Sequence, residues 1–97
     1  MEYTHLGRSG LRVSRLCLGT MNFGPETEEV DSHAIMDAAH EYGINYFDTA
    51  NVYGRSLGRG ATEEIVGDWF ASGGGRRERT VLATKLYGDM TLSLIHI

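Results

Sequence analysis

Residues 43–54 read GINYFDTANVYG, and an α/β architecture follows from them. The stretch opens on a short apolar run, residues 44–47, of the kind that forms a buried strand. That run ends on a charged residue, Asp48, and Tyr53 follows in a loop beside Gly54. In parallel α/β sheets, the carboxyl ends of the strands form the face that binds ligands. We therefore expect a strand at residues 44–47 with chemically useful side chains directly after it.

Helices are expected on both sides of this strand. Before it, Thr27 can cap a helix with an acidic first turn, and Gly43 supplies the C-terminal stop. Apolar residues recur there at helical spacing, at Val30, Ala34, Ile35, Ala38, Ala39 and Tyr42. After the strand, Thr62 can cap a second helix. The apolar stripe of this second helix, expected in the core, consists of Ile65, Val66, Trp69 and Phe70.

A hairpin and two further strands complete the predicted order. Residues 1–14 hold two short stretches around a glycine-punctuated turn, which is typical of a β-hairpin. Residues 13–18 end on the apolar run LCL, which predicts a strand buried on both faces. After a charged, glycine-rich loop at residues 73–79, the β-branched and apolar residues 80–84 predict a third strand. Strands that alternate with helices in this way form a parallel sheet with right-handed crossovers.

Each strand of this predicted sheet runs into a polar residue, namely Thr20, Asp48 or Lys85. Parallel strands bring these ends to one face, either of an open doubly wound sheet or of a (β/α)₈ barrel. Residues 18–24 read LGTMNFG, without the G-x-G-x-x-G pattern of dinucleotide-binding open sheets, and no P-loop lysine is present. The barrel is therefore the favoured architecture.

Asp48, Tyr53 and Lys85 form a candidate catalytic group. An aspartate and a lysine on neighbouring strand ends can pair, which keeps both charged at a partly buried site. A cation beside a phenol favours the phenolate, so the lysine would make Tyr53 a stronger acid than its reference pKa of about 10 suggests. Such a tyrosine can protonate a carbonyl oxygen as hydride reaches the carbon. Taken singly, Asp48 is better explained as a turn cap and Tyr53 as a rim aromatic, but together with Lys85 they favour a catalytic site.

Residues 43–54 resemble the signature of the aldo-keto reductases, NAD(P)H-dependent enzymes on a (β/α)₈ barrel. Residues 18–21 resemble the family's first strand, residues 62–67 its second helix, and residues 82–85 its third strand with its lysine. The details are most similar to the bacterial and potassium-channel β-subunit-like branch. The resemblance covers residues 1–90 approximately. It implies an α/β fold that is part of a (β/α)₈ TIM barrel: an N-terminal β-hairpin, the first three strands and two helices.

The resemblance also implies roles for individual residues. It makes Tyr53 the general acid, Lys85 the residue that lowers the pKa of Tyr53, and Asp48 the partner that orients Lys85. The cofactor-binding positions that it implies, near the nicotinamide half of NADPH (NADP⁺), are Gly19, Thr20, Met21 and Asp48. The implied reaction is the NADPH-dependent reduction of aldehydes or ketones to alcohols, with a small-molecule carbonyl compound as substrate.

Parts of the family pattern have no counterpart in these 97 residues. His96 comes too early to be the family's catalytic histidine, and the loops that grip the cofactor's phosphates would follow the seventh and eighth strands. Residues 1–90 are expected to be the N-terminal portion of the barrel, and residues 91–97 a truncated tail whose origin as native or foreign sequence stays open. Two alternatives to the enzyme also stay open: a non-catalytic, nucleotide-sensing regulatory subunit on the same scaffold, and a functionless truncation.

Composition disfavours other classes of protein. Nine basic against thirteen acidic residues give a formal charge of −4, which argues against a nucleic-acid or anionic-membrane partner. No apolar run reaches the roughly 18–20 residues of a membrane span, and the N-terminus lacks the design of a secretory signal, so a cytoplasmic protein is expected. The sequence does not indicate an oligomeric state.

The remaining candidate residues are assigned to structure. The single cysteine, Cys17, is expected to be an inert core residue. His33 and His40 share a helix face but stand seven residues apart, so no metal site is expected. Arg55 and Arg59 could meet an anionic substrate, although a solvated loop is favoured. The arginine cluster at residues 76, 77 and 79 is expected at the opposite end of the barrel from the site.

Overall fold

The computed structural model describes residues 1–54, 58 and 60–85 of the chain. In chain order the elements are β1 (Tyr3–His5), β2 (Arg12–Ser14), β3 (Cys17–Gly19), α1 (Glu29–Glu41), β4 (Tyr46–Asp48), α2 (Ala61–Ala71) and β5 (Val81–Ala83). Strands β1 and β2 pair as an antiparallel hairpin, and β3, β4 and β5 form a parallel sheet in that order. The predicted mixed α/β organisation, with its hairpin and its alternating strands and helices, is confirmed.

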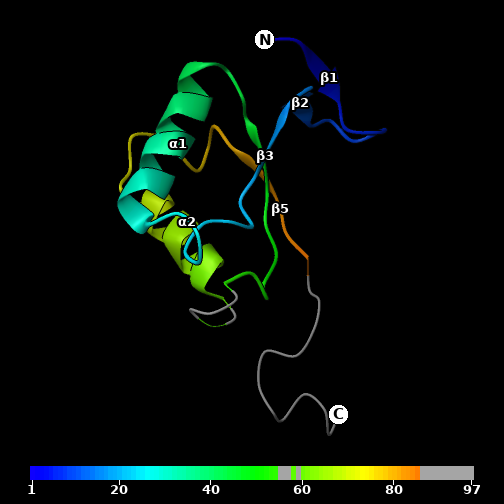
Figure 1. Ribbon diagram of the computed structural model, residues 1–97. Helices are drawn as coiled ribbons and strands as arrows, with labels where there is room; N and C mark the ends of the chain where they lie inside the picture. The colour runs from blue at the N-terminus through cyan, green and yellow to red at the C-terminus, as the bar shows by residue number, and fades with distance from the viewer. Residues whose placement is uncertain (55–57, 59, 86–97) are drawn as a thin grey trace, which may run out of the picture.

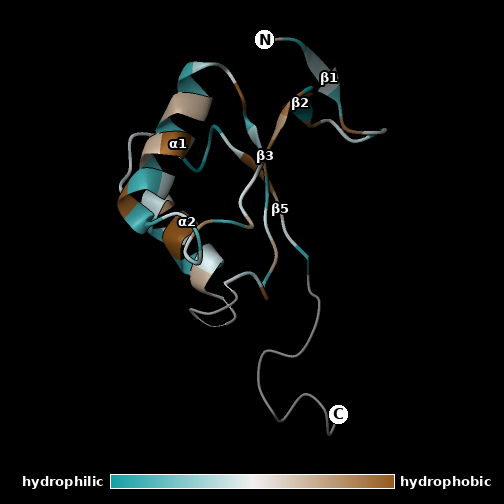
Figure 2. Cartoon of the chain, viewed as in Figure 1, coloured by the Kyte–Doolittle hydropathy of each residue, from teal (hydrophilic) through white to brown (hydrophobic). Residues whose placement is uncertain are grey.

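Both helices pack against the same face of the parallel sheet (Figure 1). The core between helices and sheet is built from Phe23, Met36, Ala39, Phe47, Ile65, Val66 and Trp69. Trp69 is 1% exposed, and its ring packs 5.6 Å from that of Phe47, measured between ring centroids. Phe70 is only partly buried against this core. Figure 2 shows hydrophobic residues on the helices and on the strands that they cover.

The other face of the parallel sheet is not covered by a helix of the described residues (Figure 1). Along β3, Leu18 packs on the core while Cys17 points away and is exposed. The prediction that residues 13–18 form a strand buried on both faces is therefore wrong, and so is the assignment of Cys17 to the core. The reason is that both helices cover one face, so alternate residues of the strand face away from them.

Residues 13–18 also do not form one strand. The chain leaves the hairpin at Ser14, whose backbone N–H donates to Asn45 Oδ1 at 2.7 Å and whose hydroxyl donates to the carbonyl of Leu16 at 2.6 Å. These side-chain bonds bend the chain at residues 15–16, after which β3 enters the parallel sheet.

Neither predicted threonine cap forms. Helix α1 begins after Glu28 without a side-chain cap, because Thr27 is held in a turn in which its carbonyl accepts the N–H of Gly24 at 2.7 Å. Helix α2 begins after Gly60, whose backbone is left-handed with a φ of 93°. Thr62 lies inside the first turn of α2 and is fully buried.

The buried face of α1 also differs from the predicted one. Of the predicted apolar stripe only Ala39 is buried, and Val30 and Tyr42 are 78% and 77% exposed. The buried residues are Ser32, Met36 and Ala39, which follow one another at helical spacing. Ser32 is tolerated in the core because its hydroxyl donates to the carbonyl of Glu28 at 2.9 Å.

Several predictions lie outside the described residues: those on Arg55, Arg59 and His96, and that on residues 91–97 as a tail. In the part of the chain that the structure describes, neither helix is long and apolar enough to cross a bilayer.

Candidate functional site

The carboxyl ends of β3, β4 and β5 lie side by side. In the register of the sheet, Gly19 pairs with Asp48, and Asp48 pairs with Ala83. The ladder continues past the strands, since the N–H of Thr49 donates to the carbonyl of Ala83 at 2.8 Å and that of Thr20 to the carbonyl of Asp48 at 3.1 Å. The topology thus brings the three predicted strand ends together, as expected for parallel strands.

The ammonium of Lys85 contacts both of the other predicted catalytic residues, Asp48 and Tyr53. Its Nζ donates to Asp48 Oδ1 at 2.7 Å, to the carbonyl of Thr49 at 3.1 Å and to the hydroxyl oxygen of Tyr53 at 3.4 Å. Because Lys85 has only protons to give, the oxygen of Tyr53 accepts in this contact. The phenol proton of Tyr53 is therefore left to donate elsewhere.

Charge in this cluster is governed by the Lys85–Asp48 contact. The hydrogen bond to Asp48 is the main reason that the pKa of Lys85 lies above its ordinary value of 10.5. Partial burial acts in the opposite direction, and the hydrogen bond to Tyr53 adds to the increase. Lys85 is therefore a cation at neutral pH, which places a fixed positive charge beside the hydroxyl of Tyr53.

The loop that carries Tyr53 is fixed through its backbone. The carbonyl of Tyr53 accepts from the N–H groups of Gly60 and Thr62, both at 3.2 Å. Gly54 is buried with a φ of 148°, and a Cβ there would overlap the carbonyl oxygen of Gly58. The turn after Tyr53 therefore needs glycine at position 54.

A groove of about 330 Å³ lies at these strand ends. Its lining contains all four predicted cofactor-binding positions together with Tyr53, and consists of Gly19, Thr20, Met21, Asn22, Asp48 and Tyr53. Lys85 does not line the groove but contacts two residues that do. Asn22 was missed by the sequence analysis, although its place directly after Met21 in the loop was a usable signal.

Other candidate residues face elsewhere. The imidazole of His33 is bonded to the carbonyl of Ile65 at 3.0 Å, and that of His40 to the hydroxyl of Thr80 at 2.8 Å. Among the described residues, no three His, Cys, Asp or Glu side chains are grouped so that they could hold a metal ion. Cys17 is exposed, and partial burial of its thiol, followed by the charge of Asp48, raises its pKa, which disfavours the reactive thiolate.

The arginines of residues 76–79 lie in the loop that precedes β5, at the opposite end of the strand from Lys85. Arg76 is 3.5 Å from Asp37 of α1, and the guanidinium of Arg77 lies over the ring of Phe70. Arg79 donates to the carbonyls of Gly74 and Gly75. These arginines therefore hold their own loop against the helices.

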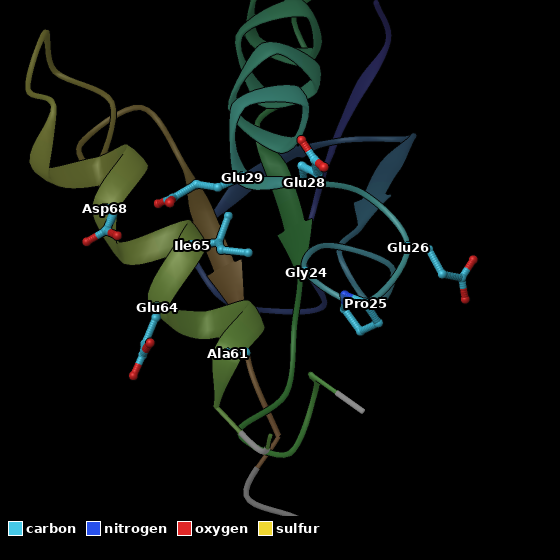
Figure 3. Close-up of a pocket in the computed structure, with 9 residues that line it drawn as sticks. All are labelled: Gly24, Pro25, Glu26, Glu28, Glu29, Ala61, Glu64, Ile65 and Asp68. Atoms are coloured by element: carbon cyan, nitrogen blue, oxygen red, sulfur yellow. The ribbon is translucent and has the colours of Figure 1, made fainter. Parts of the chain in front are cut away.

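A larger hollow, of about 700 Å³, lies on the outer side of the molecule between the start of α1 and α2 (Figure 3). Five carboxylates line it, on Glu26, Glu28, Glu29, Glu64 and Asp68. Figure 3 shows Glu26 pointing away from Glu64 and Asp68 rather than toward them. The carboxylates do not converge on one point as ligands of a cation would, and none of the predicted site residues lines this hollow.

Comparison with known proteins shows the family to which the chain is similar. The model of the aldo/keto reductase family matches residues 15–94. The chain is 64% identical over 87 residues to the uncharacterized oxidoreductase YrpG of Bacillus subtilis (strain 168), an alignment that covers 90% of this chain and 27% of that protein.

Two further relatives are more distant. Protein Tas of Escherichia coli (strain K12) is 43% identical over 91 aligned positions, in an alignment that covers 91% of this chain and 26% of that protein. A probable voltage-gated potassium channel subunit beta of Oryza sativa subsp. japonica is 39% identical over 104 aligned positions, gaps included, in an alignment that covers 100% of this chain and 30% of that protein. The chain thus spans between 26% and 30% of the length of these relatives.

Proposed function

The chain belongs to the aldo/keto reductase family, and from this premise we propose that the full-length protein that contains it is an NADPH-dependent oxidoreductase that reduces aldehydes or ketones to alcohols. We place the described residues as the N-terminal part of a (β/α)₈ TIM barrel, a fold of about 250 residues. The observation that carries the proposal is the contact of Lys85 Nζ with both Asp48 Oδ1 and the hydroxyl of Tyr53, beside a groove at the strand ends.

The groove fits one end of the cofactor. Gly19 leaves open space where a side chain would stand, and Thr20 and Met21 line the groove with Asp48 and Tyr53. Its volume of about 330 Å³ is at the small end of ligand sites, which supports a place for the nicotinamide half alone. When bound there, NADPH supplies the hydride for the carbonyl carbon.

The chain's own residues supply the proton. The phenol of Tyr53 donates to the substrate carbonyl oxygen, and the alkoxide that hydride addition would create becomes the alcohol hydroxyl. As the proton leaves, the ammonium of Lys85 stabilises the negative charge on the phenol oxygen. Asp48 holds that ammonium in place through the 2.7 Å contact. The substrate is a small carbonyl compound, and the formal charge of −4 in these 97 residues argues against a nucleic-acid or anionic-membrane partner. We propose that the enzyme is cytoplasmic.

A second candidate is a nucleotide-sensing regulatory subunit on the same scaffold. It is favoured by the 39% identity to a protein named as a probable potassium channel subunit beta. Such a subunit would use the groove of Gly19, Thr20 and Asp48 to bind NADPH without turning over a carbonyl substrate.

Carbonyl-dependent oxidation of NADPH by the full-length protein separates the two candidates. We expect the absorbance of NADPH at its reduced-nicotinamide band to fall only when an aldehyde or ketone from a mixed panel is added, and the matching alcohol to accumulate in equal amount. Tight binding of NADPH without alcohol formation across the panel would refute the enzyme and support the sensor.

A further inference from the structure

Thr62 joins the two loops that form the groove. Its hydroxyl donates to the carbonyl of Phe23 at 2.7 Å, in the loop after β3. Its backbone N–H donates to the carbonyl of Tyr53 at 3.2 Å, in the loop after β4. Thr62 itself is fully buried in the first turn of α2. One residue of a helix therefore bonds both loops at once.

Each of these carbonyls is directly connected to the groove. The N–H of Phe23 donates to the carbonyl of Thr20 at 3.0 Å, and the hydroxyl of Thr20 donates to the carbonyl of Asp48 at 2.8 Å. Thr62 donates to the backbone carbonyl of Tyr53, and the side chain of the same residue carries the hydroxyl that is the proposed proton donor. A displacement at Thr62 would therefore reach both the groove wall and the proposed proton donor.

Thr62 lies where the loop after β3 packs against the start of α2. In Figure 3 the loop with Gly24 and Pro25 runs beside the start of α2, where Ala61 and Ile65 are labelled. Thr62 lies in the same turn of α2 and is 0% exposed. Since its hydroxyl does not cap the helix, its hydrogen bond to the loop is the one use of that hydroxyl that the structure describes.

We propose that Thr62 is a positioning residue for the reductase reaction, which sets the distance between the groove wall and the hydroxyl of Tyr53. This inference rests on the proposed function, because it assigns Thr62 a role in the same site. Small misplacements of reacting groups cost rate, so loss of the Thr62 hydroxyl lowers kcat/KM for the carbonyl substrate by about 10- to 100-fold. Thr62→Ser keeps the hydroxyl, so its kcat/KM stays within about threefold of that of the original protein.

The test uses the full-length protein with Thr62→Val, Thr62→Ser and a matched control, Thr80→Val. Thr80 is also a buried threonine whose hydroxyl donates to a carbonyl, that of Arg76 at 2.7 Å, but it lies at the other end of β5. Thr62→Val loses one buried hydrogen bond and Thr80→Val loses two, so a purely structural effect is at least as large in Thr80→Val. If Thr62→Val does not fold, Thr62→Ala takes its place.

Two readouts are measured, and the first needs no catalysis. Amide hydrogen exchange at Phe23, whose carbonyl loses its hydrogen bond, is expected to become about five- to tenfold faster in Thr62→Val and to stay unchanged in Thr62→Ser and Thr80→Val. The second is kcat/KM below the melting temperature of all variants, where only Thr62→Val falls.

The outcomes keep the two claims apart. Unchanged exchange in Thr62→Val, or an equal change in Thr80→Val, overturns the role of Thr62. Faster exchange with unaltered kcat/KM in an active enzyme also overturns it. Faster exchange in a protein that reduces no carbonyl compound refutes the proposed function, while the contact between Thr62 and the two loops is supported.

Discussion

The Lys85–Asp48 pair matters more for the geometry of the site than for the stability of the fold. The two residues are predicted to pair because a partly buried site would need both charges balanced. In the structure, the side chains of Lys85 and Asp48 are 49% and 36% exposed. Solvent screens exposed ion pairs, so little of the stability of the fold depends on this contact. Its consequence is geometric, since it holds a cation 3.4 Å from the hydroxyl of Tyr53.

Thr49 is a buried residue whose hydroxyl has no partner among the described residues. We expect Thr49→Val, which keeps the shape and removes the hydroxyl, to stabilise the protein by about 1 kcal/mol, because an unpaired buried hydroxyl is costly. In a protein of barrel size this raises the melting temperature by about 2–4 °C, measured by calorimetry.

Thr80→Val is the matched control for Thr49→Val. The hydroxyl of Thr80 donates to the carbonyl of Arg76 and accepts from His40 Nε2 at 2.8 Å, so its removal costs about 1–3 kcal/mol. A melting temperature that falls equally in the two variants would show that Thr49 has a hydrogen-bond partner in the full-length protein.

At the scale of elements, the helical spacing of apolar residues predicted where the helices lie but not which face of α1 is buried. Val30 and Ile35 match a helical stripe, yet the helix buries Ser32 and Met36. The error has a physical cause. The hydroxyl of Ser32 donates to the carbonyl of Glu28, so this polar side chain can be buried at a position where an apolar residue was expected. The predicted Thr62 cap is absent because Thr62 lies inside the first turn of α2 and its hydroxyl donates to the carbonyl of Phe23.

His40 of α1 makes the stability of the loop before β5 depend on pH. Its Nε2–H donates to Thr80, whose own hydroxyl proton is given to Arg76. Burial first, and then Arg79, lowers the pKa of His40 below its ordinary value of 6.5, with Asp37 opposing. The unfolded chain therefore takes up this proton more readily than the folded one, and stability present above pH 6.5 is lost as the pH falls toward the lower folded pKa.

The expected result is a melting temperature that falls between pH 8 and pH 5 by more in the original protein than in His40→Gln. Glutamine can donate to Thr80 in the same way and does not titrate. Calorimetry at both pH values supplies the comparison. Parallel pH profiles for the two proteins would contradict a role for His40, because all other titrating groups are shared.

At the scale of the molecule, the contact between Asp48 and Lys85 was predictable because the topology of parallel strands assembles it. Lys85 and Asp48 are 37 residues apart, and parallel strands that end at both positions bring them within 2.7 Å. Asn22 and the role of Thr62 were not predictable in this way. Asn22 lines the groove through its place directly after Met21 in the loop, and Thr62 acts through a bond to a backbone carbonyl, which leaves no pattern in the sequence.

The exposed face of the parallel sheet follows from the same topology. Both helices cover the face of Leu18 and Phe47, and the face of Cys17 has no helix from the described residues. The chain spans 26% to 30% of the length of its relatives. We propose that further strands of the barrel close over this face in the full-length protein, so that the groove of Asp48 and Tyr53 becomes the enclosed mouth of the barrel.

The central claim is that Tyr53 gives the proton to the substrate. It is tested most directly by the single-turnover rate of hydride transfer from bound NADPH in the full-length protein and in Tyr53→Phe. Phenylalanine keeps the ring and removes only the hydroxyl, so the affinity for NADPH should stay within about twofold while the rate falls by about 10²- to 10⁴-fold. An unchanged rate of hydride transfer in Tyr53→Phe, with NADPH bound, would contradict the account.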